Sequence, residues 1–335
     1  MIKFSGNRTE FGQFYGGRLK EFHYELFAQT NPTTLKKQLQ IYEKYYPELI
    51  TEHLAAAEIL NINPEILFYE DLASFVDVTK RRLNKRNHGC TIFAIRENGK
   101  VFVGRNYDWL PIAREFFERY YIEIAGANRY FCFSDESVWR HHTGKNSRKF
   151  YMEDALNEHG LYIGLTFSHI EKWNYGLSPS HLIRYIAEHC STTRQALNAF
   201  RRIPCAIPKN FLIADKTGDL AIVEHTAKNF EIIRPGQNGV LVQTNHCLSP
   251  KLQKIDPILK HDPKATSFVR FAEANYLIAE QLPNFQYTDL ARILRNSHYI
   301  YNPETIWTLA FELTEPRLNI YYDTVNGSKH TKFTF

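Results

Sequence analysis

The first part of the chain has its hydrophobic residues at helical spacing. One apolar stripe covers residues 35–46 and is interrupted by Pro47, and a second follows over residues 48–60. A proline inside such a pattern ends a helix because it has no backbone N–H to donate. Asn63-Pro64 then has a capping residue before a proline, which is typical of a helix start. The pattern predicts that residues 1–89 form a helical segment.

Five basic residues then occur within seven positions and have no apolar periodicity. They are Lys80, Arg81, Arg82, Lys85 and Arg86. Such a run is typical of a solvated loop. It also leaves open a function without catalysis, in which the protein is a binding module that meets an acidic partner through this run.

At Cys90 the pattern changes from helical spacing to the alternation of a strand. The segment CTIFAIRE alternates its apolar side chains, Asn98-Gly99 is a hairpin signal, and the return strand continues to Trp109. We expect further strands at residues 120–125, 161–167, 210–214, 220–225, 230–233, 240–245, 306–313 and 317–322.

Helices are expected in pairs between these strands. Ser178-Pro179 begins one helix, and Thr192 with Gln195 forms a capping box for the next. A later pair is expected at residues 266–281 and 287–296. Many antiparallel strands with helices arriving in pairs predict an α+β fold, in which helices cover the sheets.

The composition is that of a globular protein, with 44% hydrophobic and 23% charged residues. The net charge of +5, from 41 basic and 36 acidic residues, is too small and dispersed to indicate nucleic acid as the main partner. There is no apolar run of about 18 residues and no apolar stretch in the polar start MIKFSGNRTE. We therefore expect neither a membrane span nor a secretory signal, and a cytoplasmic location.

The five cysteines and 14 histidines show no metal-binding or disulfide pattern. The cysteine count is odd, no CxxC pair occurs, and the histidines form no HExxH motif. No GxxxxGK(S/T) or GxGxxG nucleotide motif occurs either. We expect no metal and no cofactor, and we expect most cysteines to be small buried residues.

The most informative position is Gly89-Cys90, where the basic loop meets the first strand. A cysteine after a glycine is well placed to attack its own preceding peptide bond, because glycine has no side chain to obstruct attack and tolerates strained backbone angles. The hairpin also returns Asp108 to a place beside the start of the first strand. From position alone, the commoner role of such a cysteine is a small core residue.

Three separated motifs change this balance. Cys90-Thr91 with the return-strand segment GRNYDW, Thr244-Asn245-His246, and the segment SFVR that ends at Arg270 occur in this order. Together they resemble the choloylglycine hydrolase and penicillin acyltransferase families of N-terminal nucleophile hydrolases. The resemblance spans nearly all of residues 90–335, and the helical leader is similar to the pro-segment of the acyltransferase branch.

The resemblance implies a four-layer αββα sandwich, made as a precursor that cuts itself between Gly89 and Cys90. Residues 1–89 would then be an α chain and residues 90–335 a catalytic β chain, which pack as one unit in an α/β heterodimer. Cys90 would attack a linear amide or thioester of a small acyl substrate, and the acyl-enzyme would pass to water or to an amine acceptor. The acyl group and any higher oligomer stay open.

The freed α-amino group of Cys90 has an ordinary pKa of about 8, which suits a general base for its own thiol. The resemblance implies that Asp108 orients the amine and thiol, and that the Asn245 amide binds the oxyanion. The alternative for Asp108 is a surface ion pair, and the alternative for Asn245 is a hydrogen bond within a turn.

Two arginines are further candidates. Arg105 would face the other side of an ideal strand from Asp108, and would reach the same site only if the strand bends. Arg270 stands in a motif that can also be aligned with Ser267 in the place of the family's arginine. Arg270 is therefore either a site residue or a charge on the helix surface.

A serine hydrolase is the nearest alternative enzyme class. The segment Gly176-Leu177-Ser178-Pro179-Ser180 is close to GxSxG but lacks the final glycine. Because a proline follows the serine, Ser178 is better explained as a helix cap.

Overall fold

The computed structural model describes residues 1–21, 32–71, 89–136, 150–170, 172–226, 229–261, 264–315, 317–324 and 327–334. The predicted basic loop at residues 80–86 lies outside the described residues.

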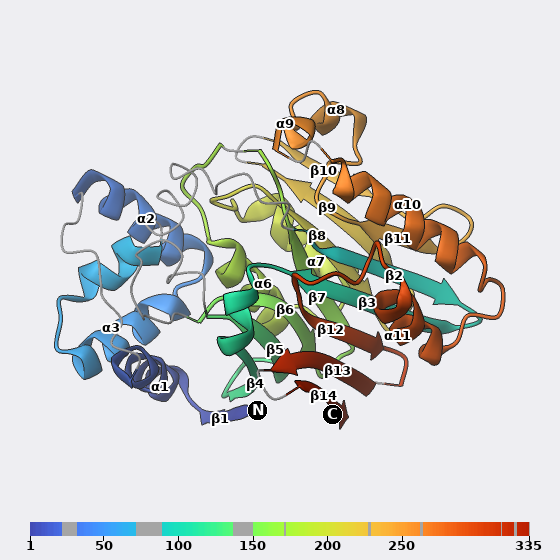
Figure 1. Cartoon of the computed structure of the whole chain (residues 1–335). Coiled ribbons are helices and arrows are strands. Elements are labelled where there is room, and N and C mark those ends of the chain that lie inside the picture. Colours follow the sequence, from blue (N-terminus) through green and yellow to red (C-terminus); the bar gives the residue numbers. More distant parts are fainter. Residues whose placement is uncertain are drawn as a thin grey trace.

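Two sheets form the centre of the molecule (Figure 1). The first has the order β1-β4-β5-β6-β7-β8-β9-β10, and its strands are β1 (Ile2–Gly6), β4 (Phe117–Ile124), β5 (Tyr130–Asp135), β6 (Met152–Asn157), β7 (Leu161–Phe167), β8 (Lys209–Asp215), β9 (Leu220–His225) and β10 (Phe230–Ile233). The second has the order β11-β2-β3-β12-β13-β14, and its strands are β11 (Val240–Gln243), β2 (Thr91–Glu97), β3 (Lys100–Asp108), β12 (Thr305–Glu312), β13 (Arg317–Thr324) and β14 (Gly327–Thr334). Neighbouring strands are antiparallel except β1 and β4, which are parallel.

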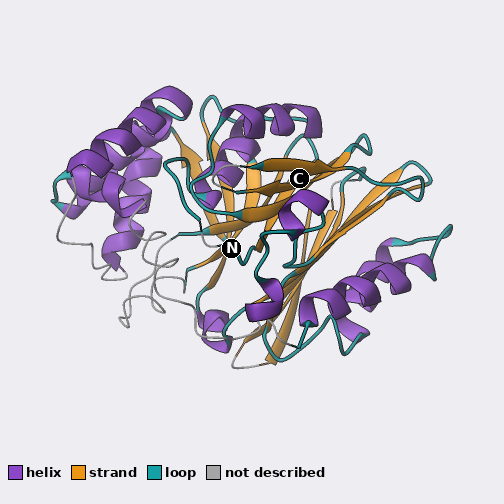
Figure 2. Ribbon diagram, turned by 90° about the horizontal axis from the view of Figure 1, so that it is seen from above, coloured by secondary structure: helices purple, strands orange, loops and turns teal. Residues whose placement is uncertain are grey.

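Helices cover the outer faces of both sheets (Figure 2). The eight-stranded sheet contacts α6 (Pro179–His189) and α7 (Thr193–Arg202), and the six-stranded sheet contacts α10 (Thr266–Ala279) and α11 (Tyr287–Asn296). The N-terminal helices α1 (Arg8–Glu21), α2 (Pro32–Tyr45) and α3 (Glu48–Leu60) lie at one side, shown in blue in Figure 1. Short helices are η1 (Pro111–Glu115), α8 (Pro250–Gln253) and α9 (Ile258–His261).

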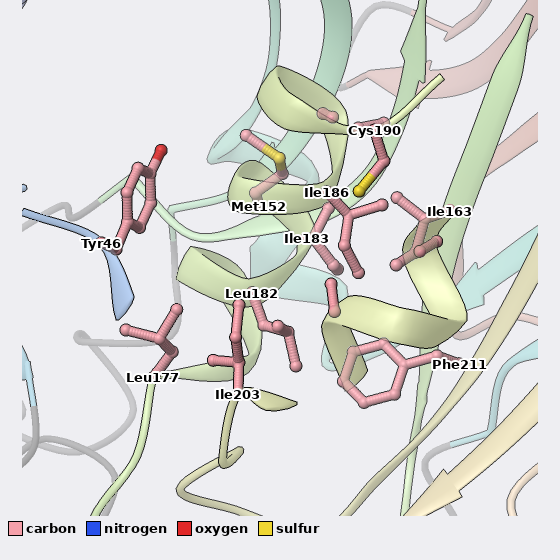
Figure 3. Packing of buried hydrophobic residues seen from close by; sticks show 14 of the residues in the cluster. Tyr46, Met152, Ile163, Leu177, Leu182, Ile183, Ile186, Cys190, Ile203 and Phe211 are labelled. Atoms are coloured by element: carbon pink, nitrogen blue, oxygen red, sulfur yellow. The ribbon is translucent and has the colours of Figure 1, made fainter. Parts of the chain in front are cut away.

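Three hydrophobic clusters fill the interfaces between these layers. The largest joins α6 and α7 to the eight-stranded sheet, and Figure 3 shows Ile183 and Ile186 of α6 with Ile163 and Phe211 of the sheet. A second cluster, which includes Trp307, fills the space between the two sheets. A third joins the six-stranded sheet to α10 and α11. The expected αββα order of layers is therefore confirmed.

Local signals in the sequence correspond to the observed turns and caps. Asn98 and Gly99 both have positive φ, at 49° and 75°, as the hairpin turn between β2 and β3 requires. The hydroxyl of Ser178 accepts a hydrogen bond from the His181 N–H at 3.1 Å and caps α6. The expected capping box is only half formed, because the Gln195 side chain accepts from the backbone N–H one residue before the cap, at 2.6 Å.

Four strands were not expected from the pattern. They are β1, β5, β6 and β14. The first 89 residues are thus not helical throughout, since β1 lies at an edge of the eight-stranded sheet beside β4. The sequence of β6, MEDALN, has the polar composition of a loop, yet every residue in it is buried. No helix among the described residues is both long and apolar enough to cross a membrane.

Candidate active site

Cys90 lies directly before β2, at the end of the inter-sheet core. It is buried, with 4% of its surface exposed, and belongs to the same cluster as Ile92 and Tyr107. All five cysteines of the chain are free and buried. The Cys90 backbone N–H donates to Oδ1 of Asn245 at 2.9 Å. The atom that would become the α-amine is therefore already held by a side chain from another strand end.

Asn245 follows β11 and connects three parts of the site. Its Oδ1 accepts from the Cys90 N–H and from Nη2 of Arg270, both at 2.9 Å, and its Nδ2 donates to the carbonyl of Phe167 at 3.0 Å. If the amide were turned over, its NH2 group would face the Cys90 N–H and the Arg270 guanidinium, which are also donors, and its oxygen would face the Phe167 carbonyl, which is also an acceptor. The network therefore determines which amide atom faces Cys90.

Arg270 lies on α10 and reaches the start of β2. Its Nη1 donates to the Cys90 carbonyl and to the Thr91 hydroxyl, the latter at 3.1 Å. It is 3% exposed, so it is a buried charge of the site and not a helix-surface charge. A Cβ at position 89 would overlap this guanidinium, which explains why glycine precedes the cysteine.

Ser267 is one helical turn before Arg270 and anchors the Asn245 turn. Its hydroxyl accepts from the backbone N–H groups of Asn245 and His246 at 2.9 and 3.1 Å. The two alternatives of the alignment therefore have different positions in the fold. Ser267 holds the turn that presents Asn245, and Arg270 contacts the cysteine.

Asp108 ends β3 on the other side of Cys90. Its carboxylate oxygens accept from Asn302 Nδ2 and the Thr305 hydroxyl, both at 2.8 Å. Its link to the thiol runs through its backbone, whose hydrogen bond lowers the pKa of Cys90. Burial raises the pKa of Asp108 to about 6, although the charge of Arg270 opposes this.

Arg105 faces the thiol without any bend in the strand. Ile92 pairs with Arg105, so Cys90, two residues before Ile92, lies on the same side of the sheet. Arg105 is fully buried and its Nε lies 3.0 Å from Asp154 across the inter-sheet space. As expected for an ideal strand, alternation places the side chains of Arg105 and Asp108 on opposite faces, so Arg105 reaches the face of Cys90 and not that of the Asp108 carboxylate.

Two charged residues near the thiol were missed in the sequence. Glu153 on β6 is 4% exposed, and its Oε2 lies 3.9 Å from Nη2 of Arg105. Among the described residues neither of these two atoms has a hydrogen-bond partner. Lys209 begins β8 and is 9% exposed. The sequence does contain an acidic pair, Glu153-Asp154, but nothing local shows that the pair is buried. Its position is explained only by Arg105, which reaches it from the other sheet.

Burial controls the protonation of this cluster. It raises the pKa of the Cys90 thiol, which the charge of Arg105 opposes. It raises the pKa of Glu153 to about 8 despite Arg105 and Lys209, and it lowers the pKa of Lys209. Across the described part of the chain, no group of three or more His, Cys, Asp or Glu residues could hold a metal ion. The site can therefore present a thiol, amide donors and buried charges to a carbonyl substrate.

Residues 95–326 match the acyl-coenzyme A:6-aminopenicillanic acid acyl-transferase family. This match covers more than half of the chain. The chain belongs to this acyltransferase family. The matched region contains Arg105, Asp108, Asn245 and Arg270 but begins after Cys90. No curated protein sequence matches this acyltransferase-family chain.

Solved structures with the same fold are N-terminal nucleophile hydrolases. Penicillin V acylase from Agrobacterium tumefaciens has a TM-score of 0.50 and 15% identity, and the match covers 73% of this chain and 86% of that chain. The Caenorhabditis elegans ortholog of N-acylethanolamine-hydrolyzing acid amidase has a TM-score of 0.52 and 14% identity, and the match covers 73% of this chain and 100% of that chain. The R18L variant of conjugated bile acid hydrolase from Clostridium perfringens has a TM-score of 0.51 and 13% identity, and the match covers 73% of this chain and 92% of that chain. The acyltransferase-family chain thus has the N-terminal nucleophile hydrolase fold.

The raised pKa of Glu153 predicts a pH-dependent stability difference between the wild type and Glu153→Gln. The folded state binds this proton more tightly than the unfolded state, so its stabilising contribution is complete below about pH 4.5 and is lost as the pH rises towards about 8. Glutamine stays neutral, so the variant should gain stability relative to the wild type across this window. Urea unfolding from pH 4.5 to 8.5 measures the difference. A difference that stays constant with pH contradicts the raised pKa.

Proposed function

We propose that this acyltransferase-family protein is a self-processing cysteine amidohydrolase or acyltransferase with Cys90 as its nucleophile. The observation that carries the proposal is the hydrogen bond from the Cys90 backbone N–H to Asn245, next to the Arg270 contact with the Cys90 carbonyl. The backbone N–H of the core cysteine Cys247 also donates to a side chain, Asp256. What distinguishes Cys90 is that Arg270 contacts both its carbonyl and the Asn245 oxygen that accepts from its nitrogen.

Self-cleavage requires the Cys90 sulfur to attack the carbonyl carbon of Gly89. The C–N bond between the two residues breaks, the thiol proton is transferred to the departing nitrogen, and a thioester forms. Water then hydrolyses the thioester, which leaves a carboxylate on Gly89 and a free thiol on Cys90. The overlap that any Cβ at position 89 would make with Arg270 supports glycine as the residue that allows this geometry.

Amide hydrolysis then repeats the same chemistry on a substrate. The free α-amine of Cys90 takes the thiol proton, the sulfur attacks the substrate carbonyl, and the amine product leaves with that proton. Water or an acceptor amine resolves the acyl-enzyme. We favour hydrolysis because water is always present.

Asn245 has two roles in this scheme. Its Oδ1 holds the Cys90 nitrogen before cleavage and is placed to hold the amine afterwards. Its Nδ2 carries two hydrogens, and the one that does not bond the Phe167 carbonyl is left for the oxyanion of the tetrahedral intermediate. Asn245 thus orients the nucleophile and stabilises the charge that forms.

Asp108 and Arg105 act from opposite sides of Cys90. The Asp108 backbone hydrogen bond and the Arg105 charge both lower the pKa of a thiol that burial raises. We assign Asp108 to orienting the amine and thiol, and Arg105 to favouring the thiolate. Arg270 positions Cys90 and Asn245 relative to each other.

The N-terminal segment is proposed to stay bound as an α chain after cleavage. β1 pairs along its length with β4 of the catalytic part. Buried charges also connect the two parts, because Arg184 on α6 donates to both carboxylate oxygens of Glu52 at 2.6 Å, and Arg8 lies 2.6 Å from Glu188. Each of these pairs joins one residue before position 89 to one after it. The two chains would therefore form a stable heterodimer.

The substrate is proposed to be a small acyl amide. The structural neighbours are named for acting on penicillin V, N-acylethanolamines and conjugated bile acids. The serine alternative loses support, since Ser178 is occupied as the cap of α6. The binding-module alternative depends on residues 80–86, which lie outside the described residues.

Self-cleavage predicts two fragments, residues 1–89 and 90–335, that elute together in gel filtration. Cys90→Ala should stay at 39.3 kDa and keep the wild-type circular dichroism, because alanine removes the nucleophile with little change of volume. Intact-mass analysis after incubation at neutral pH measures both. A wild-type chain that stays whole under these conditions contradicts self-processing.

The two roles of Asn245 can be separated with two variants. Asn245→Asp keeps an oxygen that accepts from the Cys90 nitrogen but has no N–H, so iodoacetamide should still alkylate Cys90 while kcat falls by about 10² to 10³. Asn245→Ala removes both functions and should also slow self-cleavage. Alkylation rates and kcat of the processed protein measure the split. Wild-type kcat in Asn245→Asp would remove the oxyanion role.

A further inference from the structure

Lys209 is a buried cation beside the proposed nucleophile that the reaction scheme does not use. It is 9% exposed and pairs with Phe167 at the end of β7 and the start of β8. Its Nζ lies over the Phe167 ring, 4.4 Å from the centroid. Among the described residues its ammonium makes no hydrogen bond and no ion pair.

The position of Lys209 follows from contacts that lead to Cys90. The Phe167 carbonyl accepts from Asn245 Nδ2 at 3.0 Å, and the same amide holds the Cys90 nitrogen through Oδ1. This end of the eight-stranded sheet is therefore linked through Asn245 to the backbone of Cys90. The charge of the Cys90 thiolate raises the pKa of Lys209, as a nearby opposite charge does.

A buried ammonium without an anionic partner is costly, because burial removes its water. Burial lowers the pKa of Lys209 accordingly, although Glu153 and Cys90 oppose this. Glu153 has no ion pair with Lys209, and its own pKa is raised to about 8, which leaves much of it neutral at pH 7. The described part of the chain therefore leaves the charge of Lys209 without full compensation.

We propose that Lys209 is a specificity-determining residue that binds an anionic group, a carboxylate or a similar oxyanion, on the amide substrate. Such an anion gives the ammonium the anionic partner that it lacks among the described residues, and the Phe167 ring contacts the same Nζ. The substrate would thus be an N-acyl amide that carries a carboxylate. This inference rests on the proposed function, since it needs Cys90 to be the nucleophile.

The carboxylate could be on either side of the scissile bond. An N-acyl amino acid carries it on the leaving amine, and an amide of a dicarboxylic acid carries it on the acyl group. Three substrates with the same acyl length separate the cases: an N-acylglycine, the matching N-acylethanolamide, and the ethanolamide of the matching dicarboxylic half-acid. The neutral ethanolamide is the reference for the other two.

We expect the processed wild type to prefer one carboxylate substrate over the neutral reference. In Lys209→Met, that ratio of kcat/KM should fall by about 10- to 100-fold, as expected for loss of a charge-assisted hydrogen bond, mainly through KM. Lys209→Arg should restore most of the preference. Lys216→Met, at an exposed lysine beyond the other end of β8, is the matched control and should keep the wild-type ratio.

Each outcome has a separate meaning. A self-cleaved enzyme whose preference is the same in wild type and Lys209→Met overturns the role of Lys209 but leaves the proposed function intact. A self-cleaved wild type that prefers the neutral ethanolamide also overturns it. A chain that neither cuts itself nor hydrolyses any of the three amides overturns the proposed function, and this inference with it.

Discussion

The hydrogen bond between the Cys90 backbone nitrogen and Asn245 is the interaction on which the site depends. It joins the start of β2 to the end of β11, so the pairing of these two strands determines whether the contact can form. Ser267 and Arg270, both on α10, then hold Asn245 and Cys90 from the outer layer. The site is thus assembled where one helix and two strand ends meet, and the four layers of the fold serve to bring them together.

Buried charge is the second constraint. Arg105 crosses the inter-sheet space to Asp154, close to Glu153, in a region otherwise filled by aromatic and aliphatic side chains. Charges in such a place need partners, and this cluster is only partly paired. Burial raises the pKa of Glu153 and of Asp154, and among the described residues Lys209 has no ion pair. Near the thiol the protein therefore has charged groups whose hydrogen bonds are not all made among the described residues. A bound substrate can supply the missing partners.

The sequence predicted what depends on local pattern. The Asn98-Gly99 turn, the cap at Ser178 and the two helix pairs are local, and all appear in the structure. It failed where partners are distant in the chain. In β6, the acidic residues Glu153 and Asp154 are tolerated in a buried strand because Arg105 reaches them from the other sheet. Residues 2–6 form the strand β1 because they pair with β4. Alternation alone put Arg105 on the opposite face from Asp108, but only the β2–β3 register shows that Cys90 lies on the same face as Arg105.

The central claim is that Cys90, as an N-terminal residue, carries the acyl group. The most direct test is to quench the processed enzyme during turnover of an accepted amide and to measure the intact mass and peptide map of the catalytic fragment. The account predicts that the fragment begins at Cys90 and gains the mass of one acyl group, on its N-terminal peptide. An acyl group on any other residue, or turnover by a fragment that does not begin at Cys90, would contradict it.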